Sequence, residues 1–123
     1  METEVKRILA VKDDKDILDI YQYIFNEAGY EVYTSLTGKD LQELISEFHP
    51  ALVLLDINLG ELNGVDLCRQ LKDDPTTAGI SVLLVSANLH ISELVTLSGA
   101  DGYIPKPFDL EDLLLRTAGF FAA

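Results

Sequence analysis

LVLLD (Leu52–Asp56) is an unbroken apolar run that ends in a carboxylate. A short run of this kind is typical of a strand buried on both faces of a parallel sheet. Three other apolar runs also have a polar residue just past their ends. These polar residues are Asp13, Ser86 and Lys106. Because functional groups of open α/β sheets collect at the carboxyl ends of the strands, we expect the four side chains to converge at one edge. Such a pocket suits a carboxylate that receives a phosphoryl group beside a divalent cation.

Short apolar runs alternate with stretches of helical periodicity along the chain. This alternation predicts repeated βαβ units and a mainly parallel sheet. We expect strands at 8–11, 31–34, 51–55, 80–85 and 103–104. We expect helical stripes at 17–28, 41–48, 65–71, 91–97 and 110–114, the last with Phe120 and Phe121 as further candidates. Asn63 and Asp109 are the predicted N-caps of the third and fifth helices, and 57–64 is predicted to be a glycine-bearing loop.

The length and composition fit one domain of ordinary type. The chain has 123 residues, of which 48% are hydrophobic and 24% charged. No apolar stretch approaches the roughly 20 residues that span a bilayer, and the acidic N-terminus lacks the apolar core of a secretory signal. We therefore expect no membrane segment and a cytoplasmic location. Cys68 is the single cysteine, so it forms no internal disulfide and is predicted to be a packing residue.

The charge balance argues against two classes of partner. The formal net charge is −12, and the nine basic residues are scattered along the chain without a cluster. A surface of this charge repels nucleic acid and anionic lipid. We expect no direct binding to either, and we expect the acidic pocket to favour a cation.

Five groups of residues together resemble the receiver domains of bacterial two-component response regulators. They are Val11-Lys12-Asp13-Asp14, Leu54-Leu55-Asp56-Ile57-Asn58, Asn63-Gly64, Ser86-Ala87 and Gly99-Ala100-Asp101-Gly102-Tyr103-Ile104-Pro105-Lys106-Pro107-Phe108. The likeness covers the chain from Arg7 onward, so residues 1–123 are interpreted as a single receiver domain. The resemblance implies a flavodoxin-like, doubly wound α/β fold. Its sheet has five parallel strands in the order 2-1-3-4-5, flanked by five helices in three layers.

The resemblance also implies a signalling switch, not an enzyme. Asp56 would accept a phosphoryl group from a phosphohistidine of a sensor kinase or phosphotransfer protein, while Lys106 and Ser86 contact phosphoryl oxygens. The implied Mg²⁺ ligands are Asp13, Asp56 and the backbone carbonyl of Asn58. The implied switch residues are Ser86 and Tyr103, and Asn58 and Asn88 are placed to influence the lifetime of the acyl phosphate. The implied output is a downstream protein or a linked output domain outside this chain, and we expect a monomer or weak dimer.

Lys12 departs from the family, which usually has two successive acids after the first strand. The departure replaces a carboxylate with an ammonium beside the predicted metal site. At about 4 Å and an effective dielectric near 20, one charge pair interacts by roughly 4 kcal/mol, so Mg²⁺ affinity is expected to fall. Two interpretations stay open. One is a working receiver with weak Mg²⁺ binding, and the other is a degenerate receiver in which Lys12 pairs with Asp56 and the domain acts as a phosphorylation-independent interaction module.

Two rival functions are weaker. A small phosphohydrolase resembling the haloacid dehalogenase superfamily would use an aspartate nucleophile, but it expects a second aspartate two residues later, where this chain has Asn58. A flavin-binding module would need a phosphate loop after Val11, and none is present. His49 and His90 lack partners at metal-ligand spacing and are predicted to be surface or loop residues.

Overall fold

The computed structural model describes residues 6–88 and 90–121. Its main sheet is parallel and has the order β2-β1-β3-β6-β7. The strands are β1 (Arg7–Val11), β2 (Glu31–Ser35), β3 (Leu52–Asp56), β6 (Ser81–Ser86) and β7 (Gly102–Pro105). Counted within this sheet alone, the order is the predicted 2-1-3-4-5, and the flavodoxin-like fold is confirmed. Predictions for residues 1–5 and 122–123, including the reading of the N-terminus, lie outside the described residues.

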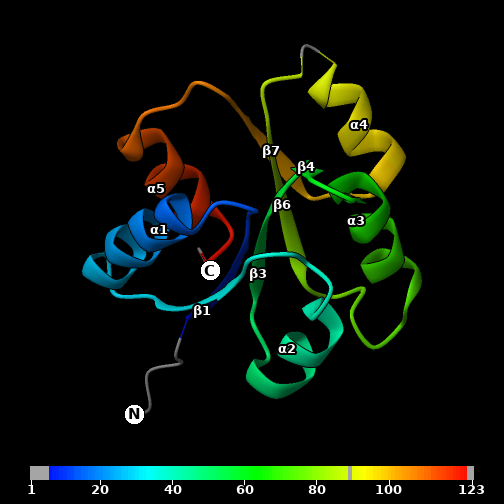
Figure 1. The fold of residues 1–123 in the computed structure, drawn as a ribbon, viewed down its shortest axis with the longest axis horizontal. Coiled ribbons are helices and arrows are strands. Elements are labelled where there is room, and N and C mark those ends of the chain that lie inside the picture. Colours follow the sequence, from blue (N-terminus) through cyan, green and yellow to red (C-terminus); the bar gives the residue numbers. More distant parts are fainter. Residues whose placement is uncertain (1–5, 89, 122–123) are drawn as a thin grey trace.

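Five helices cover the two faces of the sheet. They are α1 (Lys15–Glu27), α2 (Leu41–Phe48), α3 (Gly64–Asp73), α4 (Ile91–Ser98) and α5 (Leu110–Gly119). Figure 1 shows α1 and α5 together on one side, with α2, α3 and α4 on the other, which gives the predicted three layers. Within residues 6–88 and 90–121, no helix has the length and apolar character needed to cross a bilayer.

The alternation of side chains along β1 divides the core in two. Ile8 and Ala10 belong to the cluster that packs under α1 and α5, whereas Leu9 and Val11 belong to the cluster under α2, α3 and α4. Successive residues of a strand point to opposite faces, so both faces of this sheet are buried. The same alternation determines the direction of the polar residues that follow each strand.

Side-chain caps begin three of the helices. The carboxylate of Asp14 accepts from the backbone N–H groups of Asp16 and Ile17 and caps α1. Asn63 accepts from the Val65 N–H and caps α3, and Asp109 accepts from the Asp112 N–H and caps α5. Each cap satisfies N–H groups that the first turn of a helix leaves unpaired. The predicted caps of α3 and α5 are therefore confirmed.

Two local predictions were wrong. The segment predicted as a loop contains a short hairpin of β4 (Asn58–Leu59) and β5 (Leu62–Asn63), whose turn begins at Gly60 with φ +65°. A glycine with positive φ at this position is typical of a two-residue hairpin turn.

The end of the chain also differs from the prediction. The last helix ends at Gly119, and Phe120 and Phe121 pack against the core from beyond its end. Leu110, expected on the buried stripe of this helix, is 51% exposed because it lies in the first turn, next to the cap.

Candidate functional site

Asp56 is a buried carboxylate at the end of the central strand β3. It is 3% exposed, and β3 is paired with β1 on one side and β6 on the other. Its Oδ1 accepts the Asn58 N–H at 2.9 Å, and its Oδ2 lies 2.6 Å from Lys106 Nζ. A buried charge is stable only where partners compensate for lost water. Both oxygens of Asp56 have such partners.

Lys106 reaches Asp56 from the end of β7. Its backbone N–H donates to the Ser86 carbonyl at 2.9 Å, which ties the residue to the end of β6. Its side chain then crosses β6 to reach Asp56 on β3, forming an ion pair 50 residues apart in sequence. The predicted meeting of Lys106 with Asp56 is present in the structure.

Lys12 reaches the same carboxylate from β1. Val11 pairs with Leu55 in the β1–β3 register, so Lys12 stands opposite Asp56, and its N–H donates to the Ser35 carbonyl at 3.1 Å. Its Nζ lies 3.3 Å from Asp56 Oδ2 and 3.3 Å from Asp13 Oδ1. Burial disfavours the charged ammonium, but the carboxylates of Asp56 and Asp13 outweigh this effect and raise the pKa of Lys12. Lys12 therefore bridges the two carboxylates.

Ser86 lies near this cluster without bonding to its charged groups. It is the last residue of β6 and is 2% exposed. Its Oγ accepts the Asn88 N–H at 2.9 Å. Across residues 6–88 and 90–121, no hydrogen bond joins this Oγ to Asp56, Lys12 or Lys106. The hydroxyl proton remains available for a group placed above Asp56.

Two of the residues predicted to modulate the site, Tyr103 and Asn88, contact partners other than Asp56. The backbone carbonyl of Tyr103 accepts from Arg116 at 2.7 Å, and the Arg116 guanidinium lies 5.9 Å from the Tyr103 ring. Asn88 Oδ1 accepts the His90 N–H at 2.7 Å, so this side chain organises the loop before α4. Asn58 contributes its backbone N–H to Asp56 and leaves its side chain exposed.

Sequence reasoning missed two neighbours of Asp56. Gly64 lies so close that an added Cβ would overlap the Asp56 carbonyl oxygen and lie 2.8 Å from Ile57 Cα. The Asn63-Gly64 pair was a signal of the helix start, but not of this contact. Tyr21 was recognised only as a core residue. Burial, and secondarily the charge of Asp56, raise its pKa to about 12.

The oxygen donors around Asp56 are arranged for an ammonium. Mg²⁺ is held by one or two carboxylates and several waters, and the residues predicted to hold it are Asp13, Asp56 and the Asn58 carbonyl. The Lys12 ammonium, however, stands between the two carboxylates. Asp14, the remaining acid nearby, is engaged as the cap of α1. Within the described parts of the chain no three His, Cys, Asp or Glu side chains form a metal cluster. As arranged, these residues fit an ammonium and not a divalent ion.

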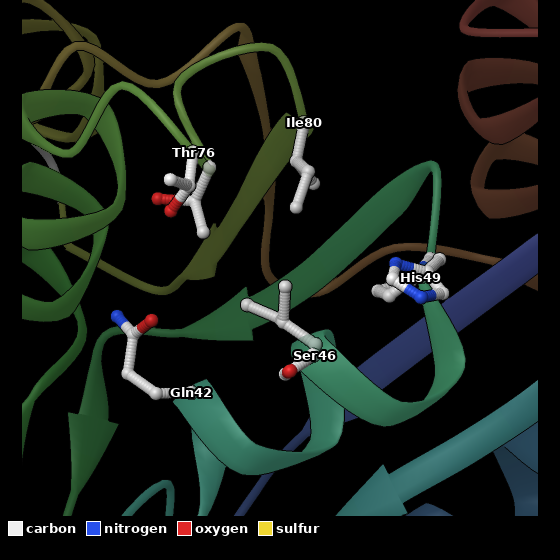
Figure 2. A pocket seen from close by; sticks show the side chains of 8 residues that line it. Gln42, Ser46, His49, Thr76 and Ile80 are labelled. Carbon is white, nitrogen blue, oxygen red and sulfur yellow. The ribbon is translucent and has the colours of Figure 1, made fainter.

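Two cavities differ in their relation to this cluster. One of about 480 Å³ lies beside Lys106 and is lined mainly by apolar groups of α1 and of the segment after β7, including Ile17 and Phe108. The other, of about 310 Å³, lies at the opposite edge of the sheet, between α2 and the loop before β6 (Figure 2). Figure 2 shows Gln42, Ser46 and His49 facing Thr76 and Ile80 across it. Its described lining has no carboxylate or ammonium. His49 and His90 are both exposed, as predicted.

Comparisons with known proteins agree with this arrangement. Residues 8–118 match the model of the response regulator receiver domain. The chain is 38% identical over 112 residues to the DNA-binding dual master transcriptional regulator RpaA of Synechocystis sp., covering 89% of this chain and 46% of that protein. It is 37% identical to the response regulator MprA of Mycolicibacterium vanbaalenii, covering 89% and 48%. The chain thus spans about half the length of these curated relatives.

A solved structure of a receiver domain has the same fold as this chain. The CheY-like response regulator receiver domain protein of Methanospirillum hungatei superposes with a TM-score of 0.85 at 32% identity, covering 94% of this chain and 93% of that one.

Proposed function

The chain belongs to the response regulator receiver domain family, and we propose that it serves in a phosphorelay as a switch whose phosphoacceptor is Asp56. Its homologues are response regulators, which are signal transducers and not classical enzymes. The observation that carries the proposal is the buried carboxylate of Asp56, held 2.6 Å from Lys106 at the carboxyl edge of the sheet.

The proposed reaction is transfer of one phosphoryl group. An oxygen of Asp56 attacks the phosphorus of a phosphohistidine or of a small acyl phosphate. The new O–P bond forms as the bond from phosphorus to the leaving group breaks, and the leaving imidazole or carboxylate keeps the electron pair. Lys106 screens the approaching phosphate, and the Ser86 hydroxyl donates to a phosphoryl oxygen as charge accumulates. The product is a mixed anhydride on Asp56.

The proposal also assigns roles in metal binding, in switching and in the lifetime of the acyl phosphate. Receiver domains generally use Mg²⁺ at this site, and the ligands in this chain would be Asp13, Asp56 and the Asn58 carbonyl, provided that Lys12 leaves the space between the carboxylates. Ser86 and Tyr103 are the proposed switch residues, and Asn58 and Asn88 the residues that influence the lifetime of the acyl phosphate.

The proposed partners are a sensor kinase or phosphotransfer protein on the input side and a downstream protein or linked output domain on the other. The relative RpaA carries DNA-binding in its name, and about half of its length lies beyond the matched part. For this chain we propose signalling through protein contacts, as a monomer or weak dimer in the cytoplasm. Its charge of −12 argues against direct binding to nucleic acid.

A second candidate is the degenerate receiver that is never phosphorylated. The observation that favours it is the ion pair of Lys12 and Asp56, since it places a second ammonium against the acceptor carboxylate. In that case the domain would act through its binding surfaces alone.

Labelling with acetyl phosphate tests the main proposal. The chain is incubated with the donor with and without Mg²⁺, and the mass of the intact protein is followed. A gain of one phosphoryl group is expected in wild type and not in Asp56→Asn, which keeps the size of the side chain but lacks the nucleophile. Labelling of Asp56→Asn to the wild-type extent would refute the assignment, and no labelling of any form under any condition would favour the degenerate receiver.

A further inference from the structure

The position of Lys12 is determined by the sheet and not by chance packing. β1 and β3 pair in register up to Val11 and Leu55, so the next residues, Lys12 just after β1 and Asp56 at the end of β3, lie side by side. Neighbours in register on parallel strands direct their side chains to the same face. The Lys12 N–H is held by the Ser35 carbonyl, which fixes where its side chain begins. The backbone pairing therefore positions the side chain of residue 12 beside Asp56.

The contacts of Lys12 are those expected of a bridging cation. Its Nζ is equidistant, at 3.3 Å, from an oxygen of Asp13 and an oxygen of Asp56. The side chain is 13% exposed, whereas that of Asp13 is 42% exposed. The ammonium therefore lies inside the site, with one buried and one open carboxylate as its partners.

The charges of the site already cancel. Lys12 and Lys106 contribute two positive charges, and Asp13 and Asp56 contribute two negative charges. An acid at position 12, as the family usually has, would leave an excess of two negative charges, which a divalent cation neutralises. In this chain a divalent ion would instead add two uncompensated positive charges in a place of low solvent access, which is electrostatically unfavourable.

We propose that the Lys12 ammonium takes the place of the divalent cation between Asp13 and Asp56, so that phosphoryl transfer to Asp56 needs no Mg²⁺. The inference rests on the proposed function, because it concerns the same acceptor. The bonds formed and broken are those given above, and the donor is the only co-reactant. Lys12 acts here as a group that contacts the reacting carboxylate and screens the incoming phosphate together with Lys106.

The first test is labelling by acetyl phosphate in excess chelator and in excess Mg²⁺. Wild type is expected to be labelled at rates within about threefold of each other in the two conditions. Lys12→Asp, which restores the acid pair, is expected to lose at least about tenfold of its rate in chelator and to recover it with Mg²⁺. Lys15→Gln is the matched control, because Lys15 is an exposed lysine three residues away that pairs with Asp19 at 3.0 Å. It is expected to behave as wild type.

The second test needs no phosphorylation. Mg²⁺ is titrated into the unphosphorylated full chain, and binding is followed by the backbone amide resonances of Asp13, Asp56 and Asn58. Wild type is expected to bind at least about tenfold more weakly than Lys12→Asp. Equal affinity of the two forms would overturn the inference, whatever the labelling shows.

The outcomes separate the inference from the proposed function. Labelling of wild type only when Mg²⁺ is present overturns the role of Lys12 and leaves Asp56 as acceptor. Labelling of Lys12→Asp with Mg²⁺ but of wild type in neither condition also overturns it and makes Lys12 the cause of a degenerate receiver. Absence of label in every form refutes both. The comparison of wild-type labelling in chelator and in Mg²⁺ does not need the variant, so the test holds even if Lys12→Asp fails to fold.

Discussion

Two half-buried lysines stand at opposite ends of the sheet and are held in different ways. Lys72, on α3, lies at the end where β6 begins. Its Nζ contacts Asp101 Oδ2 at 2.7 Å, the Ile80 carbonyl at 2.7 Å and the Ala78 carbonyl at 3.2 Å. Lys12, at the carboxyl end of the strands, contacts two carboxylates at 3.3 Å each.

The difference separates a lysine that joins elements of the fold from one that bridges the carboxylates of the candidate site. An ammonium has three protons, and Lys72 has three acceptors at hydrogen-bonding distance, two of them backbone carbonyls. Asp101 is fixed in turn by the Val82 N–H at 2.8 Å. Lys12 is held at longer distance, and both of its partners are carboxylates. The first cluster joins elements of the fold, while the second neutralises two carboxylates of the candidate site.

Removing the carboxylate at each end gives the largest contrast. Asp56→Asn is expected to abolish labelling by acetyl phosphate. Asp101→Asn is expected to keep the labelling rate within about threefold but to lower the free energy of unfolding by about 1–2 kcal/mol, since Lys72 loses its charged partner at a partly exposed site. Intact mass and urea denaturation measure the two effects. Loss of labelling in a folded Asp101→Asn would show that the clusters are not independent.

Replacing the lysines themselves gives the next contrast. Lys72→Met is expected to lower the free energy of unfolding by about 2–3 kcal/mol, because two carbonyls and a carboxylate lose their donor. Lys12→Met is expected to cost less than about 1 kcal/mol, because Asp56 keeps Lys106. Urea denaturation of the two variants at neutral pH checks this order. Equal losses would remove the distinction between the clusters.

Alkaline pH probes the helix that covers the Asp56 end. The pKa of Tyr21 is raised from 10.0 to about 12 in the folded chain. Below pH 10 the ring is protonated in both states and its stabilising effect is complete. Between pH 10 and 12 the unfolded chain loses the proton first, so stability falls, by about 2 kcal/mol over that interval.

Denaturation of wild type and Tyr21→Phe across pH 9–12 checks this effect. The part of the loss due to Tyr21 should be absent in the variant, whereas Tyr23→Phe, at an exposed position of the same helix, should retain it. The pKa of Lys12 is also raised, and its contribution is lost in the same direction as the pH rises, so it remains in Tyr21→Phe. Identical curves for wild type and Tyr21→Phe would contradict the assignment.

The smallest effect is expected at an exposed lysine. Lys39 pairs with Glu61 at 3.2 Å across the surface beside the hairpin, and both side chains are largely in solvent. Lys39→Gln is expected to change the free energy of unfolding by no more than about 0.5 kcal/mol and to leave labelling unaltered. The same urea and mass measurements apply. A loss as large as that of Lys72→Met would mean that burial is not what distinguishes these lysines.

The fold was predictable because each strand carries its own signal. Continuous apolar runs such as Leu52–Asp56 mark strands buried on both faces, and the strand order came from the family resemblance. The hairpin at 58–63 was not predicted, since two-residue strands are too short for periodicity to register. The packing of Phe120 and Phe121 also escaped, because an apolar residue after a helix can reach the core without extending the helix.

The site was predictable to the level of which residues approach Asp56. The positions of Lys106 and Asp13 were predictable because each follows a strand. The direction of the Lys12 side chain was not, because a long flexible side chain has several allowed conformations, and only the register with β3 selects among them. Asp14, an acid close in sequence to position 12, is the N-cap of α1. The roles proposed for Ser86, Tyr103, Asn58 and Asn88 depend on the phosphorylated state and stay predictions.

Gly64 places the start of α3 in direct contact with the backbone of Asp56. With no side chain between them, the first turn of α3 rests directly on the Asp56 carbonyl, and there is no soft layer of methyl groups to absorb a displacement. A shift of the Asp56 backbone by a fraction of an ångström would therefore displace α3 as a rigid unit. Lys72 lies in the last turn of α3, so such a displacement would reach the opposite end of the sheet through a single helix.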